Sequence, residues 1–237
     1  MAVSNSTTFS LNAQELVVAS LEVLGIKSDE EPLQQVELER GLRWLNIMLK
    51  AWEVDGVMAW TLTEGSFALV QSDADYVFGS GGTFTTVPVD ILDVRINRGG
   101  NDLPMTRLSR EDYNWLPNKT IEGYPTQYYY DRQRDSGTLY VWPVPDVTGG
   151  TLKFTYRRRI MDLDNPTDSF DLPQEWYMAL VYGLADQLIT IYGRSGTPRA
   201  ADITQRALLA YNSVKSFDID EGESSMFVVP DTYARPR

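Results

Sequence analysis

The chain has 237 residues, of which 43% are hydrophobic and 23% are charged, and this composition is typical of a globular protein with one large or two modest domains. The sequence contains no cysteine and no histidine, which excludes disulfides, thiolate or imidazole metal sites, cysteine nucleophiles and Ser-His-Asp triads. A net charge of −12 disfavours a protein that holds nucleic acid by neutralising its phosphates. No apolar run approaches the roughly 20 residues that a membrane helix needs, so we expect no contact with a membrane.

Two helices are predicted in the first sixty residues. Asn12 and Glu15 form a capping-box pattern, and Gly25 fits the left-handed residue that ends a helix. Pro32 is taken as the start of the second helix, which ends at Asp55. Its apolar residues recur at steps of four and three, at Leu38, Leu42, Leu45, Leu49 and Trp52.

Short β-branched and aromatic runs separated by turn residues predict strands between Ala59 and Phe170. The candidate strands are 60–63, 66–70, 76–78, 87–96, 105–108, 128–131, 138–142 and 151–156. Residues 135–137 and 148–150 are interpreted as hairpin turns between adjacent runs, which imply antiparallel pairing. Residues 109–116 favour one helical turn. This region is therefore expected to form an antiparallel β sandwich or a barrel-like sheet.

Helical periodicity returns near Leu172. The third helix carries one apolar stripe, at Trp176, Leu180, Leu184, Leu188 and Ile191. The fourth helix begins at Pro198, reaches about Phe217, and carries Ala201, Leu208, Tyr211 and Val214. Because no single helix can bury its own stripe, the four helices are expected to pack together.

The predicted fold class is α+β. A four-helix domain is built from both ends of the chain, with the β domain inserted and an extended C-terminal arm. The corresponding segments are 1–60 and 171–217 for the helical domain, 61–170 for the β domain and 218–237 for the arm.

The arm begins with acidic and small residues and ends in SMFVVPDTYARPR. This end is too apolar for a purely solvating tail, so it is interpreted as a segment that binds a partner, and the competing interpretation is a frayed terminus. The candidate partner-binding residues are Met226, Phe227, Val228, Val229, Tyr233, Arg235 and Arg237.

Glycine and acidic clusters give little support for a ligand site. Residues 79–82 are glycine-rich, but no Lys followed by Ser or Thr comes next, so a loop tip is favoured over a phosphate site. The acidic residues of 162–168 lack the glycine of a calcium loop. Residues 218–222 resemble the opening of such a loop, but Gly222 comes one position early and Val229 replaces the glutamate at the twelfth position. We expect both to be solvated turns, and we expect no metal, no cofactor and no catalytic residue.

Two further patterns keep alternatives open. Paired carboxylates could hydrolyse a glycan without histidine, and a sugar platform could be formed by Tyr124, Tyr128, Tyr129, Tyr130, Tyr140 and Trp142. Alternating aromatic residues in strands are nevertheless first of all sheet faces. Arg157, Arg158 and Arg159 follow a strand, where consecutive side chains point to opposite faces, so they cannot form one basic patch.

The order of these features resembles the head-to-tail adaptor proteins of tailed phages. The similarity is to the tail tubular protein A family of short-tailed phages and to related tail accessory factors that stabilise packaged DNA. It rests on LVVASLEVLGI, LERGLRWLNIMLKAWEVDGV, GYPTQYYYD, TLYVWPVPD and DLPQEWYMALVYGLADQLITIYG, which together cover most of the chain in this order.

The resemblance implies a structural virion protein and not an enzyme. Copies would form a homo-oligomeric ring, a dodecamer, under the portal protein, extending the DNA channel and offering a platform to the downstream tail or nozzle protein. The C-terminal arm would reach the portal or a neighbouring subunit. Genomic DNA would pass through without specific binding, and assembly would take place in the host cytoplasm before the protein enters the phage neck or tail.

Three other classes remain as alternatives: a tail-associated glycan hydrolase, a receptor-binding tail component and a DNA-binding packaging factor. A hydrolase would lose activity when one carboxylate is changed. A receptor-binding component would bind cells as a free protein, and a packaging factor would bind DNA in a salt-dependent manner.

Overall fold

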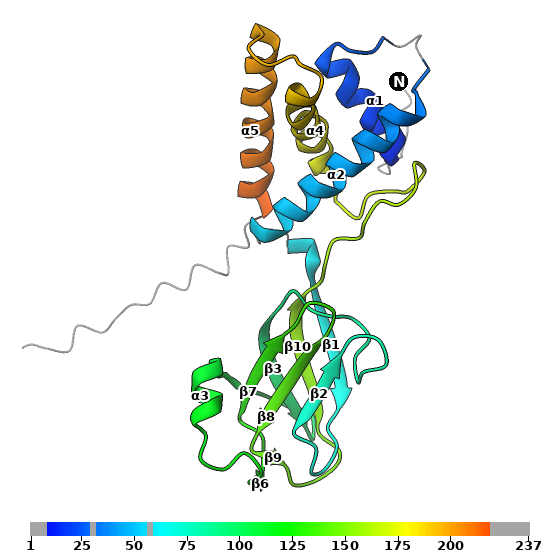
Figure 1. The fold of residues 1–237 in the computed structure, drawn as a ribbon. Helices are drawn as coiled ribbons and strands as arrows, with labels where there is room; N and C mark the ends of the chain where they lie inside the picture. The colour runs from blue at the N-terminus through cyan, green and yellow to red at the C-terminus, as the bar shows by residue number, and fades with distance from the viewer. Residues whose placement is uncertain (1–8, 29–31, 56–58, 219–237) are drawn as a thin grey trace, which may run out of the picture. The chain divides into compact units, whose positions relative to one another are not determined.

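The computed structural model describes residues 9–28, 32–55 and 59–218. The chain divides into two compact units, each described below by itself (Figure 1). The helical unit contains the described residues up to 59 together with 164–169 and 173–218, and the β unit contains 60–163 and 170–172. The described residues thus form a mixed α and β protein with five α-helices and mainly antiparallel sheets.

Helix α1 (Ala13–Leu24) has the ends that its sequence predicts. The Asn12 side chain accepts a hydrogen bond from the Glu15 backbone at 2.8 Å, and Glu15 accepts one from the Asn12 backbone at 2.9 Å. Gly25 ends the helix with φ at +71°, a conformation that other residues rarely adopt. The predicted capping box and stop are therefore confirmed.

Helix α2 (Gln35–Asp55) begins three residues after Pro32, so the predicted start was wrong. The Glu37 carboxylate accepts a hydrogen bond from the Gln34 backbone at 3.1 Å and satisfies one free N–H at the true start. Gly41 lets α2 approach α1 closely, because a Cβ there would come within 2.5 Å of Val17.

Helix α4 (Tyr177–Ile191) packs against α1, α2 and α5 (Pro198–Asp218), and the 3₁₀ turn η2 (Gln174–Trp176) leads into it. The predicted stripe of α4 is confirmed from Trp176 to Leu188. The stripe expected for α5 was right only in part. Val214 is buried and Tyr211 is half-buried, but Ala201 and Leu208 are exposed, and Ile203, which was not predicted, is buried.

An aromatic cluster joins three of these helices. The ring centroids of Trp52 and Trp176 are 5.7 Å apart, and Tyr211 lies 4.9 Å from Trp52 and 6.1 Å from Trp176. Trp176 is only 2% exposed, whereas Trp52 is half-buried. Trp176 therefore belongs to the interior of the helical unit, and Trp52 lies at its margin.

The 3₁₀ turn η1 (Ala59–Thr61) lies at the boundary between the units along the chain, and the β unit, from residue 60, contains ten short strands and helix α3 (Arg110–Trp115). The strands are β1 (Leu62–Ala68), β2 (Asp75–Phe78), β3 (Asp90–Arg98), β4 (Asn101–Pro104), β5 (Thr106–Arg107), β6 (Glu122–Gly123), β7 (Gln127–Arg132), β8 (Gly137–Trp142), β9 (Val144–Pro145) and β10 (Thr151–Arg157). The helical turn expected at 109–116 is confirmed. The two strands expected at 60–63 and 66–70 are replaced by the single strand β1, and residues 60–61 belong to η1 instead.

Two four-stranded sheets have the orders β1-β10-β3-β4 and β2-β8-β7-β5, and β6 pairs with β9. Among the described residues these sheets remain open, so the barrel-like alternative was wrong. Residues 135–137 join β7 to β8 as an antiparallel hairpin, as predicted. Residues 148–150 do not join paired strands, because β10 pairs with β1 and β3 while β8 belongs to the other sheet. The short pairs β5–β7 and β6–β9 are parallel, contrary to the antiparallel prediction.

Both four-stranded sheets contribute side chains to one hydrophobic core. Alternate residues of β8 and β10 are buried, which matches the period of two in a strand. The core residues are Leu69, Tyr76, Phe78, Ile91, Val94, Ile96, Met105, Tyr128, Tyr130, Leu139, Val141, Leu152, Phe154 and Tyr156.

Candidate interaction surfaces

The acidic turn at 162–168 is a backbone structure. The Asp168 carboxylate accepts hydrogen bonds from the backbone of Asp164 at 2.9 Å and of Asn165 at 2.7 Å. These bonds lower the pKa of Asp168, and the bond from the Asn165 backbone has the largest effect. Within the described ranges, no group of three or more acidic side chains could hold a metal ion. The hydrogen bonds to Asp168 support the interpretation of 162–168 as a turn. Residues 219–222 lie outside the described residues.

The glycine-rich segment 79–82 is a loop tip. Gly79 and Gly81 have φ of +126° and +77°, and the Gly82 backbone donates a hydrogen bond to Gly79 at 3.0 Å. The Gly79 backbone in turn donates to Phe84 at 2.8 Å, which closes the loop. The preference for a loop over a phosphate site is thus supported by the geometry.

The three consecutive arginines have separate surroundings. Arg158 forms a bidentate ion pair with Asp171, and Arg159 donates a hydrogen bond to the carbonyl of Arg134 at 2.8 Å. The Asp171 carboxylate also raises the pKa of Arg158, chiefly through this hydrogen bonding. Their separation agrees with the prediction that these residues form no common basic patch.

The aromatic residues of β7 and β8 divide between the two faces of their sheet. Tyr128 and Tyr130 belong to the core, whereas Tyr129 and Tyr140 stack with Tyr113 of α3. The ring centroids of Tyr113 and Tyr129 are 5.2 Å apart. Because α3 contributes to this stack, the tyrosines are packing residues, and they do not present the open platform that a sugar would need.

Trp115, at the end of α3, is 80% exposed, an exceptional value for tryptophan. Sequence analysis missed it as a candidate contact residue. The signal was present in the segment YNWLPN, where a lone tryptophan precedes a proline outside any periodic pattern. Large exposed aromatic residues often act as anchors in protein interfaces.

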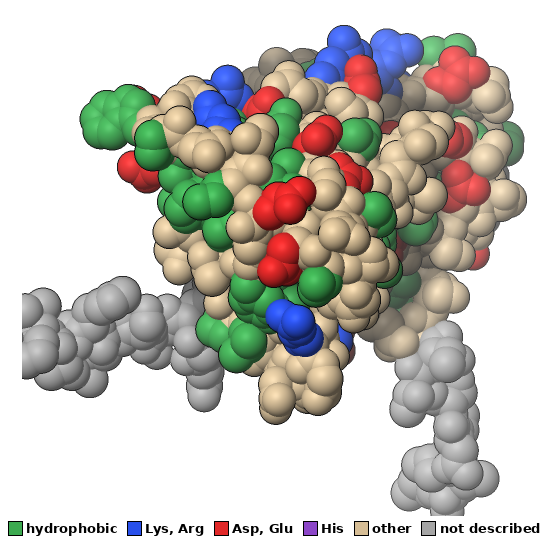
Figure 2. Space-filling view, turned by 90° about the horizontal axis from the view of Figure 1, so that it is seen from below, with side chains coloured by type: hydrophobic (Ala, Val, Ile, Leu, Met, Phe, Trp, Pro, Cys, Tyr) green, Lys and Arg blue, Asp and Glu red, His purple; other side chains and the backbone are tan. Residues whose placement is uncertain are grey.

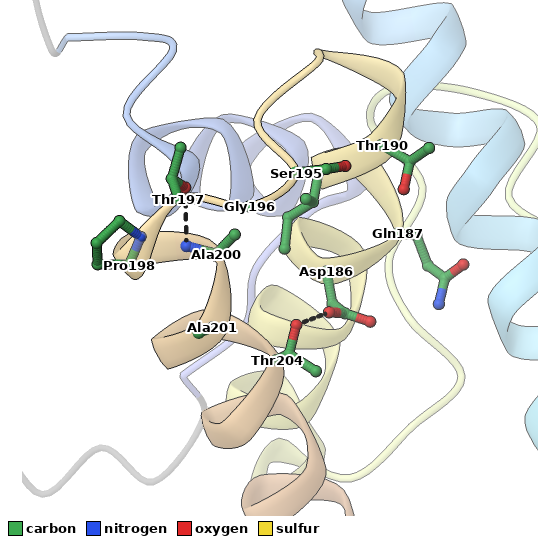
Figure 3. A pocket seen from close by; sticks show the side chains of 11 residues that line it. Asp186, Gln187, Thr190, Ser195, Gly196, Thr197, Pro198, Ala200, Ala201 and Thr204 are labelled. Atoms are coloured by element: carbon green, nitrogen blue, oxygen red, sulfur yellow. Dashed lines mark hydrogen bonds between the residues drawn. The ribbon is translucent and has the colours of Figure 1, made fainter.

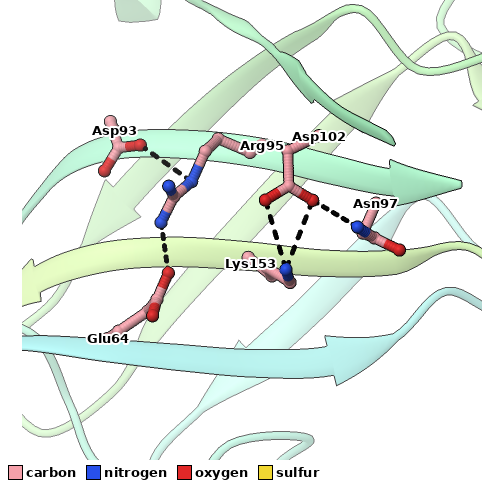
Figure 4. Close-up of polar contacts among 6 residues, drawn as sticks. All are labelled: Glu64, Asp93, Arg95, Asn97, Asp102 and Lys153. Atoms are coloured by element: carbon pink, nitrogen blue, oxygen red, sulfur yellow. Dashed lines mark hydrogen bonds and ion pairs between the residues drawn. The ribbon is translucent and has the colours of Figure 1, made fainter. Parts of the chain in front are cut away.

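The outer face of the first sheet carries a ladder of charged side chains (Figure 4). Arg95 of β3 pairs with Glu64 of β1 and, at 3.3 Å, with Asp93. Lys153 of β10 pairs at 3.2 Å with Asp102 of β4. The pKa of Asp102 is lowered mainly by a hydrogen bond from Asn97 and to a smaller extent by Lys153. Arg95 and Lys153 thus each have an acidic partner on this face, which is typical of a solvated sheet surface.

A hollow in the helical unit lies between the end of α4 and the start of α5 (Figure 3). Three of its polar side chains, those of Asp186, Thr197 and Thr204, already form hydrogen bonds. Thr204 donates a hydrogen bond to Asp186 at 2.5 Å, and Thr197 accepts one from the Ala200 backbone at 3.2 Å. With one carboxylate and mainly small uncharged residues around it, this hollow offers no pair of groups for acid and base catalysis.

The helical unit leaves large apolar side chains exposed on α2 and α5. Val36, Ile47 and Val54 of α2 are 62%, 50% and 85% exposed, and Leu208 and Leu209 of α5 are 60% and 61% exposed. Exposed apolar residues that recur on one helix face are typical of contact surfaces. Figure 2 shows a different surface, seen from the lower end of the β unit in Figure 1, where acidic side chains lie near the middle with hydrophobic ones around them.

The predicted partner-binding residues, Met226 to Val229, Tyr233, Arg235 and Arg237, lie outside the described residues. They remain a prediction. The exposed faces above are therefore the contact candidates that the structure adds.

The comparisons with known proteins bear on the whole chain. No curated protein matches it.

Among the helices that the structure describes, none has both the length and the apolar character needed to span a membrane. The family described as SU10 adaptor protein matches residues 11–226, more than nine-tenths of the sequence and parts of both units. The chain therefore belongs to the SU10 adaptor protein family, a family of phage head-to-tail adaptors.

Proposed function

We propose that this phage structural adaptor forms a ring, a dodecamer, beneath the portal protein at the head vertex. The ring extends the DNA channel and offers a platform to the downstream tail or nozzle protein. The family match over residues 11–226 carries this proposal, because it spans both units and most of the chain. The place of action is the virion neck, reached after assembly in the host cytoplasm.

The charge of the chain supports a passive channel. A net charge of −12 repels phosphates, so DNA can pass without being held. The ion pairs on the outer sheet face also leave few free cations there, since Arg95 and Lys153 each have acidic partners. Genomic DNA is accordingly a passing molecule in this proposal, without a specific site.

We further propose that the arm from residue 218 onward attaches the ring to the portal or to a neighbouring subunit. Its apolar residues Met226 to Val229 would be buried on the partner, and this burial would offset the cost of ordering the segment. Arg235 and Arg237 would pair with acidic groups at the rim, where such pairs contribute little.

The protein has no catalytic role in this proposal. A glycan hydrolase would need two carboxylates at a set separation in a cleft, and the hollow between α4 and α5 contains the single carboxylate Asp186. A receptor-binding role would be favoured only if the free protein bound host cells.

Electron microscopy of the protein mixed with purified portal rings tests the proposal. We expect a second ring, coaxial with the portal, on one face of the portal. A pull-down on portal rings then compares the full chain with a chain truncated after Asp218, at matched concentration, and we expect the truncation to weaken binding. Absence of a second ring would contradict the adaptor ring, and equal binding would move the attachment from the arm to the helical unit.

A further inference from the structure

The outward side of α2 carries a regular stripe of exposed apolar and basic residues. We define this outer stripe as Val36, Arg43, Ile47, Lys50 and Val54. Val36, Arg43 and Lys50 are seven residues apart, as are Ile47 and Val54, so all five lie on one side of the helix. The opposite side of α2, with Leu38, Leu45 and Leu49, is buried in the helical unit.

The chemistry of the outer stripe fits an acidic and apolar partner. Its three β-branched residues are between 50% and 85% exposed. Arg43 is exposed and forms no ion pair with the described residues. The Lys50 side chain remains 40% exposed beside Glu53, at 3.7 Å. An ordinary solvated helix face would be polar at the positions of Val36, Ile47 and Val54.

The chain's own continuation beyond α5 has this chemistry and starts at the correct end of the stripe. Tyr211 of α5 donates a hydrogen bond to Asp55, the last residue of α2, and Lys215 lies 3.9 Å from the same carboxylate. The C-terminal end of α5 therefore lies near the Val54 end of the outer stripe. At least 19 residues follow, and about 60 Å of extended chain is more than the roughly 27 Å length of the stripe.

The spacings also agree. Seven residues of α-helix advance about 10.5 Å, and three residues of a polyproline II segment advance about 9.3 Å and bring the side chain back to the same side of the segment. A segment that runs back along α2 from Asp55 thus meets the stripe in register. Asp220 reaches Lys50, Glu223 reaches Arg43, and Met226 reaches Val36, with Ile219 near Val54.

We propose that residues 219–227 dock on the outer stripe of α2 in the same chain, antiparallel to the helix. Docking within the chain is favoured over docking on a second copy because the short connection from α5 gives a high effective concentration. The docked segment covers the apolar residues of the stripe in the free subunit. This inference goes beyond the adaptor role and does not require it, since it concerns the unassembled chain.

Docking of the arm has a consequence for assembly. When the arm leaves the outer stripe to bind a partner, the apolar residues of the outer stripe become exposed. A subunit would therefore present this second contact face only after the arm has found its partner, which restrains association between free subunits.

Disulfide trapping tests the proposal cleanly because the chain has no native cysteine. The test variant carries Val36→Cys and Met226→Cys. The control carries Gln205→Cys and Met226→Cys, with Gln205 exposed on α5. Gln205 lies about 20 Å from the end of α5, and Val36 lies about 28 Å from the end of α2. If the arm were not docked, the disulfide should therefore form faster in the control variant, whose two cysteines are closer. Both variants are oxidised at low protein concentration after circular dichroism has shown equal helix content.

We expect the intramolecular disulfide to form at least tenfold faster in the test variant than in the control. Adding Arg43→Glu and Lys50→Glu should slow it about fivefold or more, and adding Asp220→Lys and Glu223→Lys as well should restore the rate. Equal rates in test and control would overturn the proposal, as would disulfides that form only between copies. Neither result would affect ring formation on the portal, so the two proposals fail separately.

Discussion

Tyr211 of α5 donates a hydrogen bond to the carboxylate of Asp55, the last residue of α2, 156 residues earlier in the chain. Burial raises the pKa of the Tyr211 phenol, and the bonded carboxylate raises it further. Tyr211 also packs on Trp52. The contact thus joins α2 to α5, the last helix of the helical unit, through a polar and an aromatic interaction.

Replacing Tyr211 by phenylalanine should lower the free energy of unfolding by about 0.5–1.5 kcal/mol, since one hydrogen bond is lost and the ring stays. Urea unfolding followed by circular dichroism measures this change. Tyr192→Phe is the matched control, because the Tyr192 hydroxyl is buried without a hydrogen-bond partner in the described structure. If both variants lost the same free energy, the bond to Asp55 would contribute nothing.

Replacing Trp176 by alanine should cost about 3–5 kcal/mol, the usual cost of emptying a buried aromatic site. Trp52 is half-buried, so Trp52→Ala should cost less than Trp176→Ala. Trp115→Ala, at an 80% exposed position, should change stability by less than about 0.5 kcal/mol. Chemical denaturation of the three variants measures the order, and a Trp115 cost equal to that of Trp176 would contradict it.

Alkaline pH should destabilise the β unit through Tyr130. Burial raises the pKa of Tyr130 to about 12, and its hydroxyl donates to the carbonyl of Pro88 at 3.2 Å. Between pH 10 and about pH 12 the unfolded chain therefore binds fewer protons at this residue than the folded chain does. Stability is complete below pH 10 and falls above it, by up to about 1.4 kcal/mol per pH unit for one proton.

Urea unfolding at pH 9 and at pH 11 measures this dependence. Tyr130→Phe should be less stable than the parent at pH 9, because the bond to Pro88 is lost, but should lose less stability on going to pH 11. Equal losses in the two proteins would show that other groups determine the alkaline slope.

The two compact units should be separable. Replacing residues 60–163 by a flexible linker of about ten residues removes most of the β unit and retains 164–169. That segment is bound to α1, since the Ala13 backbone donates to Asp168 at 3.0 Å and the Gln14 backbone donates to Pro166 at 2.9 Å. We expect a helical product with cooperative thermal unfolding by circular dichroism. An unfolded product would mean that the units depend on each other.

Local signals predicted both ends of α1 well, because the interactions that begin and end this helix involve nearby residues. Asn12, Glu15 and Gly25 are all within one turn of the groups they satisfy. The phase of α5 could not be predicted in the same way. Its sequence contains small and apolar residues on several sides, and contact with α4 selects Ile203 and Val214 over Leu208 for burial.

The connection at residues 148–150 shows the same limit for strands. Glycines there indicate a turn, but they do not specify which strands it joins. The pairing of β10 with β1 and β3 depends on residues more than fifty positions away. For the contact surfaces, the exposure of Val36, Ile47 and Val54 became visible only once the buried side of α2 was known.

Arg199 of α5 donates hydrogen bonds to the carbonyls of Glu22 and Val23 at the end of α1, at 3.0 and 2.8 Å. During synthesis on the ribosome, α1 and α2 emerge first, whereas the residues that cover and cap them emerge last. All residues of the β unit have been translated by residue 172, before α4 begins. The β unit can therefore fold while the first two helices still lack their partners, and the helical unit is completed only as the end of the chain leaves the ribosome.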